Sequence, residues 1–95
     1  MFRHFYVYII GNRNLTLYIG VTSNLVKRLF EHKNELVEGF SSKYKLHNLF
    51  YFEVFESVDE AIKREKQLKN WHREWKLNLI KKINPEFKDL YSEII

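Results

Sequence analysis

The sequence predicts an α+β domain in which a three-stranded antiparallel sheet is flanked by helices, with the elements in the order ββαβαα. Three short runs of β-branched and aromatic residues indicate the strands. Segments with apolar residues at helical spacing lie between and after them. With 95 residues, of which 45% are hydrophobic and 17% aromatic, the chain has material for one core, so we expect a single domain over residues 1–95.

A β-hairpin is expected at the start of the chain. Residues 5–10 are β-branched or aromatic throughout, and residues 16–19 repeat that composition after a turn-like segment at residues 11–14. Two such runs joined by a short turn pair as antiparallel strands. Gly20 is expected to end the second strand.

A helix is expected after the hairpin. Thr22 or Ser23 can cap a helix that begins near Asn24, and Gly39 is expected to stop it. The residues expected to pack on the sheet share helical spacing, and they are Val26, Leu29, Phe30, Lys33 and Val37.

The second half of the chain predicts one strand and two helices. Residues 41–47 are expected to form a loop, and residues 48–55 form the third strand. Ser57 or Asp59 is expected to cap a helix, which residues 70–73 interrupt. A further helix is expected to run to about Ile83, where the pair Asn84-Pro85 ends it. The tail residues Phe87, Leu90 and Tyr91 are expected to fold back onto the core.

The composition excludes several classes of protein. The absence of Cys removes disulfide scaffolds, thiolate zinc sites and Cys nucleophiles. The longest early apolar run, residues 5–10, is far shorter than the about 18 residues of a membrane span, and no signal-peptide pattern accompanies it. We therefore expect a cytoplasmic, soluble protein that does not bind membranes.

The positive charge is concentrated in one helical region. The net charge is +4, yet residues 61–84 carry eight Lys or Arg and only two Glu. A basic helix attracts phosphate chains, although a charge run is more often a solvated surface. The candidate nucleic-acid contacts are Lys63, Lys66, Lys69, Arg73 and Lys76, together with Lys43 from the earlier loop.

Glu65 interrupts an apolar stripe on the second helix. The stripe consists of Ala61, Ile62, Leu68, Trp71 and Trp75, and the flanking Lys and Arg side chains are expected to point elsewhere. A carboxylate that faces a core or a cleft costs free energy unless it is paired or binds a metal ion. Both a buried ion pair with a nearby Lys or Arg and a metal site remain open.

Tyr8 and Tyr18 are expected to lie opposite or diagonal to each other on the hairpin. Two phenols on one sheet face are most often simple packing. A catalytic role requires more, because a free phenol has a pKa of about 10 and needs a nearby cation before it serves as a base.

Arg28 and His32 lie one helical turn apart and face the same way. The planar guanidinium of Arg28 suits a pair of phosphate oxygens, and His32 could orient a water or contact phosphate. Alternatively, the pair forms an exposed basic edge, or His32 is a hydrogen-bonded histidine in the core.

Together these positions resemble the GIY-YIG nuclease superfamily, in particular its small single-domain branch related to the nuclease module of excision-repair proteins. The matching triplets are Tyr6-Val7-Tyr8, in which the family's Gly and Ile are replaced, and Tyr18-Ile19-Gly20, which is unaltered. The matching helical positions are Arg28 and His32 in the pattern Arg-x-x-x-His, Glu65 at the acidic position, and Trp71, Leu79-Ile80 and Asn84-Pro85 near the C-terminus.

The resemblance implies a metal-dependent endonuclease that hydrolyses phosphodiester bonds, with kinship to DNA repair, little sequence specificity, and DNA favoured over RNA as the substrate. It implies one Mg²⁺ or Mn²⁺ ion held by Glu65, because one carboxylate with waters and phosphate oxygens suits Mg²⁺. We expect no small-molecule cofactor, and either a monomer or a weak homodimer.

The resemblance also implies roles for the other site residues. Arg28 would stabilise charge on the scissile phosphate, and His32 would assist proton transfer or bind phosphate. Tyr8 would position or deprotonate the attacking water with Tyr18 as its neighbour, and the choice of base between them stays open with Tyr8 favoured. Asn84 is the candidate for the family's late Asn.

Two other function classes compete with the nuclease. One is a nucleic-acid-binding module of the same fold that cleaves weakly or not at all, which would not need Glu65. The other is a protein-interaction domain with an exposed aromatic patch, such as Trp71 with Trp75 or Phe50 with Phe52. Periodicity places those rings in the core instead, so this class ranks last.

Overall fold

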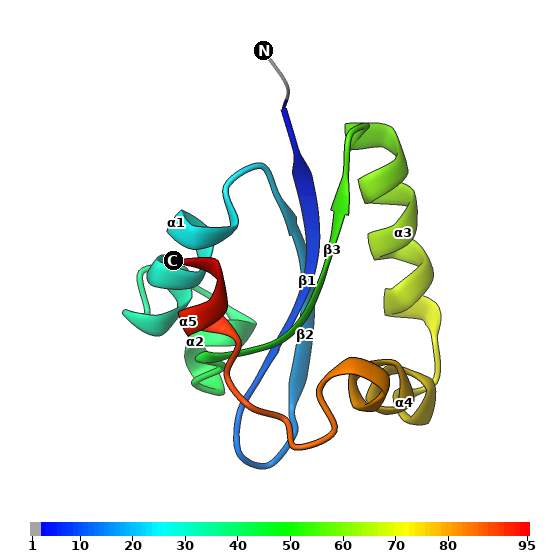
Figure 1. Cartoon of the computed structure of the whole chain (residues 1–95). Coiled ribbons are helices and arrows are strands. Elements are labelled where there is room, and N and C mark those ends of the chain that lie inside the picture. Colours follow the sequence, from blue (N-terminus) through cyan, green and yellow to red (C-terminus); the bar gives the residue numbers. More distant parts are fainter. Residues whose placement is uncertain (1–2) are drawn as a thin grey trace.

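A computed structural model describes residues 3–95 and contains one three-stranded antiparallel sheet with strand order β2-β1-β3 (Figure 1). The strands are β1 (Phe5–Gly11), β2 (Leu17–Thr22) and β3 (Asn48–Phe55). Because β1 pairs with both other strands and is buried from Val7 to Gly11, its sequence is rich in β-branched and aromatic residues. The predicted α+β class and the antiparallel sheet are confirmed.

Helices cover both faces of the sheet. They are α1 (Leu25–Lys33), α2 (Phe40–Lys43), α3 (Val58–Asn70), α4 (Arg73–Ile83) and α5 (Tyr91–Ile94). Helices α1, α2 and α5 lie on one side, and α3 and α4 lie on the other (Figure 1). Among the described residues, no helix has the length and apolar character needed to cross a lipid bilayer.

The alternation of side chains along β1 divides the core into two clusters. Val7 and Ile9 face α3 and α4, where they pack with Leu68 and other apolar residues. Tyr8 and Ile10 face the opposite side and pack with residues of α1 and β3. Tyr8 therefore lies on the α1 face even though its neighbours in sequence belong to the other cluster.

Helix α1 is shorter than the sequence predicts. It ends at Lys33 rather than at Gly39, because Glu35 takes a left-handed conformation with φ of 55°. The amide of Glu35 donates to the carbonyl of His32 at 3.1 Å, and the amide of Leu36 donates to the carbonyl of Glu31 at 2.8 Å. These two hydrogen bonds end the helix with a left-handed residue, a position that is usually glycine. The sequence therefore has no glycine at the true end of α1.

The start of α1 and its buried face also differ from the prediction. Asn24, rather than Thr22 or Ser23, caps the helix, and its Oδ1 accepts from the amide of Lys27 at 3.1 Å. The buried residues of the helix are Leu25, Leu29 and His32, whereas Val26 and Phe30 are exposed and Val37 lies beyond the helix end. This shift in phase turns His32 inward.

The loop expected at residues 41–47 contains the short helix α2. Its first residue follows Gly39, which has φ of 106° and thus serves as the entry to α2 rather than as the end of α1. Ser41 and Leu46 are buried, so this segment packs against the body of the protein.

The exposed side chains of α3 and α4 correct two further expectations. The sequence predicts Ile62 and Trp75 in the buried stripe, but both are exposed. The buried residues are Ala61 and Leu68 of α3 and Ile80 of α4. Arg64 does not point away, and its Nη2 pairs with Glu53 on β3 at 2.9 Å.

Other boundaries agree with the sequence. The third strand, the cap at Ser57, the break between α3 and α4, and the end of α4 at Ile83 lie where the patterns predict. The second strand continues two residues past Gly20 to Thr22. The tail does fold back, since Phe87 joins one core cluster and Leu90 joins the other.

Candidate active site

Gly20 makes room for the ring of Tyr8. The two residues are directly opposite in the β1–β2 pairing. A Cβ atom placed on Gly20 would lie 2.4 Å from the Tyr8 hydroxyl oxygen and 2.5 Å from the ring carbon that carries it. The glycine of the second triplet therefore lets the phenol lie flat across the backbone of β2, which no larger residue would allow.

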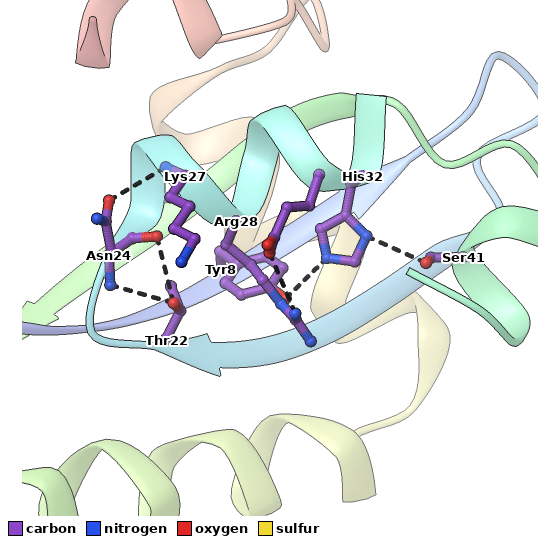
Figure 2. A network of polar contacts seen from close by, with 8 residues as sticks. Tyr8, Thr22, Asn24, Lys27, Arg28, His32 and Ser41 are labelled. Carbon is purple, nitrogen blue, oxygen red and sulfur yellow. Dashed lines mark hydrogen bonds and ion pairs between the residues drawn. The ribbon is translucent and has the colours of Figure 1, made fainter. Parts of the chain in front are cut away.

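Tyr8, His32 and Ser41 form a buried chain of hydrogen bonds (Figure 2). The Tyr8 hydroxyl lies 2.9 Å from Nε2 of His32, and Nδ1 of His32 lies 3.0 Å from the hydroxyl of Ser41. All three side chains are buried, with Tyr8 only 1% exposed. Three elements, β1, α1 and α2, thus meet at one imidazole.

The imidazole of His32 is neutral at neutral pH. Burial and, to a smaller extent, the charge of Arg28 lower its pKa from 6.5 to about 4, and Glu31 opposes the shift. A phenol gives up its hydrogen to an acceptor more readily than an aliphatic hydroxyl does. We therefore assign the tautomer in which Tyr8 donates to Nε2 and Nδ1 donates to Ser41.

Arg28 extends from α1 beside the Tyr8 hydroxyl (Figure 2). Its Nη1 lies 3.4 Å from a carboxylate oxygen of Glu31, and contact with Tyr8 raises the pKa of the guanidinium. A hollow of about 310 Å³ is lined by Lys27, Arg28 and Glu31, among others. The guanidinium is partly exposed and has open space beside it in which a phosphate could bind.

The Tyr8 hydroxyl is influenced by charges from both sides of the sheet. Burial raises the pKa of Tyr8 to about 12, and the neighbouring Arg28 offsets part of that rise. Tyr18 on β2 and Glu65 on α3 both add to the rise. Glu65 belongs to the opposite layer, so its charge acts around the β2 edge of the sheet.

Tyr18 lies diagonal to Tyr8, as the hairpin register predicts, because Tyr18 pairs with Ile10 and not with Tyr8. Its ring centroid lies 6.0 Å from that of His32. Tyr18 is partly exposed, whereas Tyr8 is almost fully buried. Of the two phenols, Tyr18 is therefore the one that a bound substrate can reach directly.

Glu65 is turned toward this cluster and not toward bulk solvent. Its side chain is 16% exposed, and its Oε2 lies 3.5 Å from the ammonium of Lys69. The same ammonium lies 5.6 Å from the centroid of the Tyr18 ring. The ion pair that the sequence offered as an alternative is present, and its ammonium lies near the ring of Tyr18.

The residues of this cluster can be compared with known proteins. A model of the GIY-YIG catalytic domain matches residues 4–78, which include Tyr8, Tyr18, Arg28, His32 and Glu65. The chain belongs to the GIY-YIG family. Because this is a family of nuclease domains, membership implies a nucleic-acid substrate.

Relatives of this GIY-YIG chain include UPF0213 proteins of bacteria. One from Clostridium perfringens is 38% identical over 93 residues, which is 94% of this chain and 96% of that protein. One from Syntrophus aciditrophicus is 39% identical over 82 residues, covering 85% and 93% of the two chains. The solution NMR structure of a UPF0213 protein from Bacillus halodurans has a TM-score of 0.58 and 22% identity, covers 90% of this chain and 92% of that one, and supports the fold.

Glu65 offers a carboxylate, the kind of ligand that a hard divalent cation prefers. Within residues 3–95 there is no group of three or more His, Cys, Asp or Glu side chains that could hold a metal ion. His32 is not a free metal ligand, because both of its ring nitrogens are in hydrogen bonds. Glu65 on α3, whose charge raises the pKa of Tyr8, is therefore the candidate ligand of this cluster. A single carboxylate with waters and substrate oxygens is a donor set that Mg²⁺ accepts.

Asn84 is committed to the main chain. It is buried at the end of α4, where its Nδ2 donates to the carbonyls of Phe50 and Lys88 at 3.1 and 2.8 Å. Its Oδ1 accepts from the amide of Lys88 at 3.0 Å. Both amide hydrogens are in use, so contact with a substrate would require Asn84 to release the backbone, and its predicted catalytic role stays a prediction.

The predicted nucleic-acid contacts are spread over three helices of the GIY-YIG chain. They are Lys43 on α2, Lys63, Lys66 and Lys69 on α3, and Arg73 and Lys76 on α4. Lys69 is the one placed beside Tyr18 and Glu65. Lys76 reaches the carbonyl of Lys69 at 3.5 Å, and its pKa is lowered by burial and by the charge of Arg73.

Sequence reasoning missed Ser41 and Glu31. Ser41 completes the hydrogen bonding of His32 from a short helix that no periodicity revealed. Glu31 pairs with Arg28 at i, i+3, and this spacing could have indicated the pair.

Proposed function

We propose that this GIY-YIG chain is a metal-dependent endonuclease that hydrolyses phosphodiester bonds in nucleic acid, with DNA favoured over RNA and with little sequence specificity. The observation that carries the proposal is that the guanidinium of Arg28 from α1 lies beside the hydroxyl of Tyr8, while Glu65 from α3 pairs with Lys69, whose ammonium lies 5.6 Å from the centroid of the Tyr18 ring. Phosphodiester cleavage needs a cation for the phosphoryl oxygens, an acceptor for a proton, and an anchor for a metal ion.

Arg28 is the group proposed to hold the scissile phosphate. Its guanidinium has five donors in a fixed plane and stays charged at any physiological pH. Tyr8 on one side and Glu31 on the other fix the direction of the side chain. Negative charge that develops on the phosphoryl oxygens would therefore meet a cation that is already in position.

The two phenols are proposed to have different roles. Tyr8 is buried, has a raised pKa and donates to His32, so it stays a neutral phenol, which suits it to orient Arg28. Tyr18 is the more accessible phenol and is proposed to contact the attacking water. This assignment differs from the choice that the sequence favoured, in which Tyr8 was the base.

Glu65 would hold the divalent ion through its carboxylate, with waters and substrate oxygens as the remaining ligands. Such an ion neutralises charge on the phosphate and lowers the pKa of a bound water. Lys69 already pairs with Glu65 and would be displaced toward the substrate as the ion binds, where it adds to the attraction for phosphates.

The test is the effect of Glu65→Gln on Mg²⁺-dependent cleavage of single-stranded, nicked and branched DNA and of RNA. Because Gln keeps the shape and removes the charge, we expect cleavage to fall by at least about 100-fold while the fold is unchanged. The matched control is Glu60→Gln, an exposed Glu on the same helix. Equal cleavage by the wild type and Glu65→Gln would identify a contaminating nuclease and refute the proposal.

The competing function is a nucleic-acid-binding module that does not cleave. Exposed Lys side chains on α2 and α3 would serve either function. The two differ in what Glu65 does. A binding module predicts that Glu65→Gln binds nucleic acid as well as or better than the wild type, and that the wild type cleaves none of the substrates with Mg²⁺ or Mn²⁺.

A further inference from the structure

A row of aromatic rings leads from the buried site to the surface. Beyond His32, the ring of Tyr18 stacks near Phe40 with centroids 6.5 Å apart and an interplanar angle of 29°. Phe40 in turn contacts Tyr44 with centroids 4.6 Å apart. Phe40 is 47% exposed and Tyr44 is 42% exposed. Two large rings thus stand open to solvent next to the candidate active site.

Positive charges flank these rings. The ammonium of Lys43 lies 5.5 Å from the centroid of Tyr44, and that of Lys69 lies 5.6 Å from the centroid of Tyr18. Lys45, which follows Tyr44 in the sequence, is also exposed. Aromatic faces interleaved with Lys are the chemistry that binds bases by stacking and phosphates by charge. A purely apolar protein partner would gain nothing from the cations.

The rings are held in place from two sides. Ser41, beside Phe40, is joined to His32 by the hydrogen bond at 3.0 Å. The side chain of Asn12, in the hairpin turn, donates to the carbonyl of Tyr44 at 2.9 Å. A surface whose position is fixed before binding loses little entropy when a ligand is added.

We propose that Phe40 and Tyr44 form a stacking platform for an unpaired nucleobase of single-stranded nucleic acid, adjacent to the phosphate held by Arg28. This inference rests on the proposed function and adds the substrate class to it. A base inside a duplex has both faces covered by its neighbours and cannot stack on a protein ring. The platform therefore selects single strands, or the unpaired part of a flap or loop.

The experiment measures binding without cleavage. Fluorescence anisotropy of labelled oligonucleotides of about 12 nucleotides is recorded in EDTA. The substrates are a DNA single strand, an RNA single strand, a blunt DNA duplex, and an abasic single strand with the same number of phosphates. The proteins are the wild type, the double variant Phe40→Ala with Tyr44→Ala, and Tyr44→Phe, which keeps the ring. The matched control is Phe30→Ala, since Phe30 is 52% exposed on α1 and makes none of the aromatic contacts described above.

The double variant is expected to bind a single strand at least about tenfold more weakly, while its binding of the abasic strand is unchanged. Tyr44→Phe and Phe30→Ala should bind as the wild type does. Ring-dependent binding of the DNA or the RNA strand supports the platform, and the tighter of the two identifies the sugar. Circular dichroism of the double variant checks that it is folded.

Three results would overturn the platform. They are a double variant that binds single strands as the wild type does, an equal loss on the abasic strand, and a wild type that prefers the duplex. Failure of the proposed function is separate, because cleavage that does not depend on Glu65 would remove the nuclease and leave ring-dependent binding in EDTA untouched.

Discussion

The two faces of the sheet differ in how they treat buried polar groups. On the face covered by α3 and α4, the buried phenol of Tyr51 donates to Glu53, which pairs with the partly exposed Arg64, and the buried amide of Asn84 binds only main-chain atoms. On the face covered by α1 and α2, His32 and Ser41 are buried and are joined to Tyr8 through side chains alone.

This difference separates stability from chemistry. A polar side chain that binds the backbone satisfies groups that folding would otherwise leave unpaired. Side chains that bind only one another satisfy no backbone group, and three apolar side chains of the same shape would pack at least as well. The Tyr8–His32–Ser41 chain contains no ion pair and all three of its members are buried, so we expect a functional reason for its cost. It lies beside the proposed phosphate-binding residue Arg28.

The largest expected effect is on the apolar face. Leu68→Ala should lower the free energy of unfolding by about 2–5 kcal/mol, because Leu68 is fully buried and a cavity would remain. Urea unfolding measures the loss, and Ile62→Ala on the same helix is the exposed control. Cleavage per folded molecule should be unchanged. If Leu68→Ala were stable but inactive, the separation between the two faces would be wrong.

The second effect is the pH dependence that His32 imposes. Its pKa is 6.5 in the unfolded chain and about 4 when folded, so between these values the unfolded state binds more protons. The contribution of His32 to the free energy of unfolding is fully present above pH 6.5 and is lost as the pH falls toward 4. At about pH 4.5 the loss is about 2–3 kcal/mol. Urea unfolding at neutral pH and at about pH 4.5 measures this loss.

The matched variants for this test are His32→Gln and His47→Gln. His32→Gln removes the titrating group and should flatten the pH dependence, whereas His47→Gln is the control for removing a partly exposed histidine outside the buried chain. An equal loss of stability at low pH in the wild type and in His32→Gln would show that His32 is not the group responsible.

The smallest expected effect separates the two kinds of buried polar group. Asn84→Ala should cost about 1–3 kcal/mol of stability, because it leaves the buried carbonyl of Phe50 without its donor, and it should leave cleavage per folded molecule unchanged. Asn78→Ala on the exposed side of α4 is the control. A tenfold or greater loss of cleavage with normal stability would instead support the catalytic role that the resemblance implies for Asn84.

Patterns between near neighbours predicted much of the fold. The β-branched run of β1, the whole of β3 and the break between α3 and α4 follow from residue types and periodicity. The predicted end of α1 was wrong because a residue other than glycine ends the helix. Glu35 ends α1 without a glycine, and the resulting phase of α1 turns His32 inward while Phe30 faces solvent.

The candidate site was predicted as a set of residues but not as a geometry. Arg28 and His32 share a helix face by their spacing, and Tyr8 and Tyr18 share a sheet face by the hairpin register. No local pattern relates Glu65 to them, because Glu65 lies on α3 in the opposite layer, and its partner Lys69 lies near the Tyr18 ring of the edge strand β2.

The sequence by itself determined the strands, the main helices and the GIY-YIG pattern, since these depend on residue preferences and spacings within a few turns of chain. Tertiary structure alone decided that Ser41 binds His32, that Arg64 pairs with Glu53, and that Phe40 and Tyr44 stand exposed beside Tyr18. These contacts join segments 9 or more residues apart. They form only when packing against the sheet fixes where each helix lies, and no spacing along the chain encodes that position.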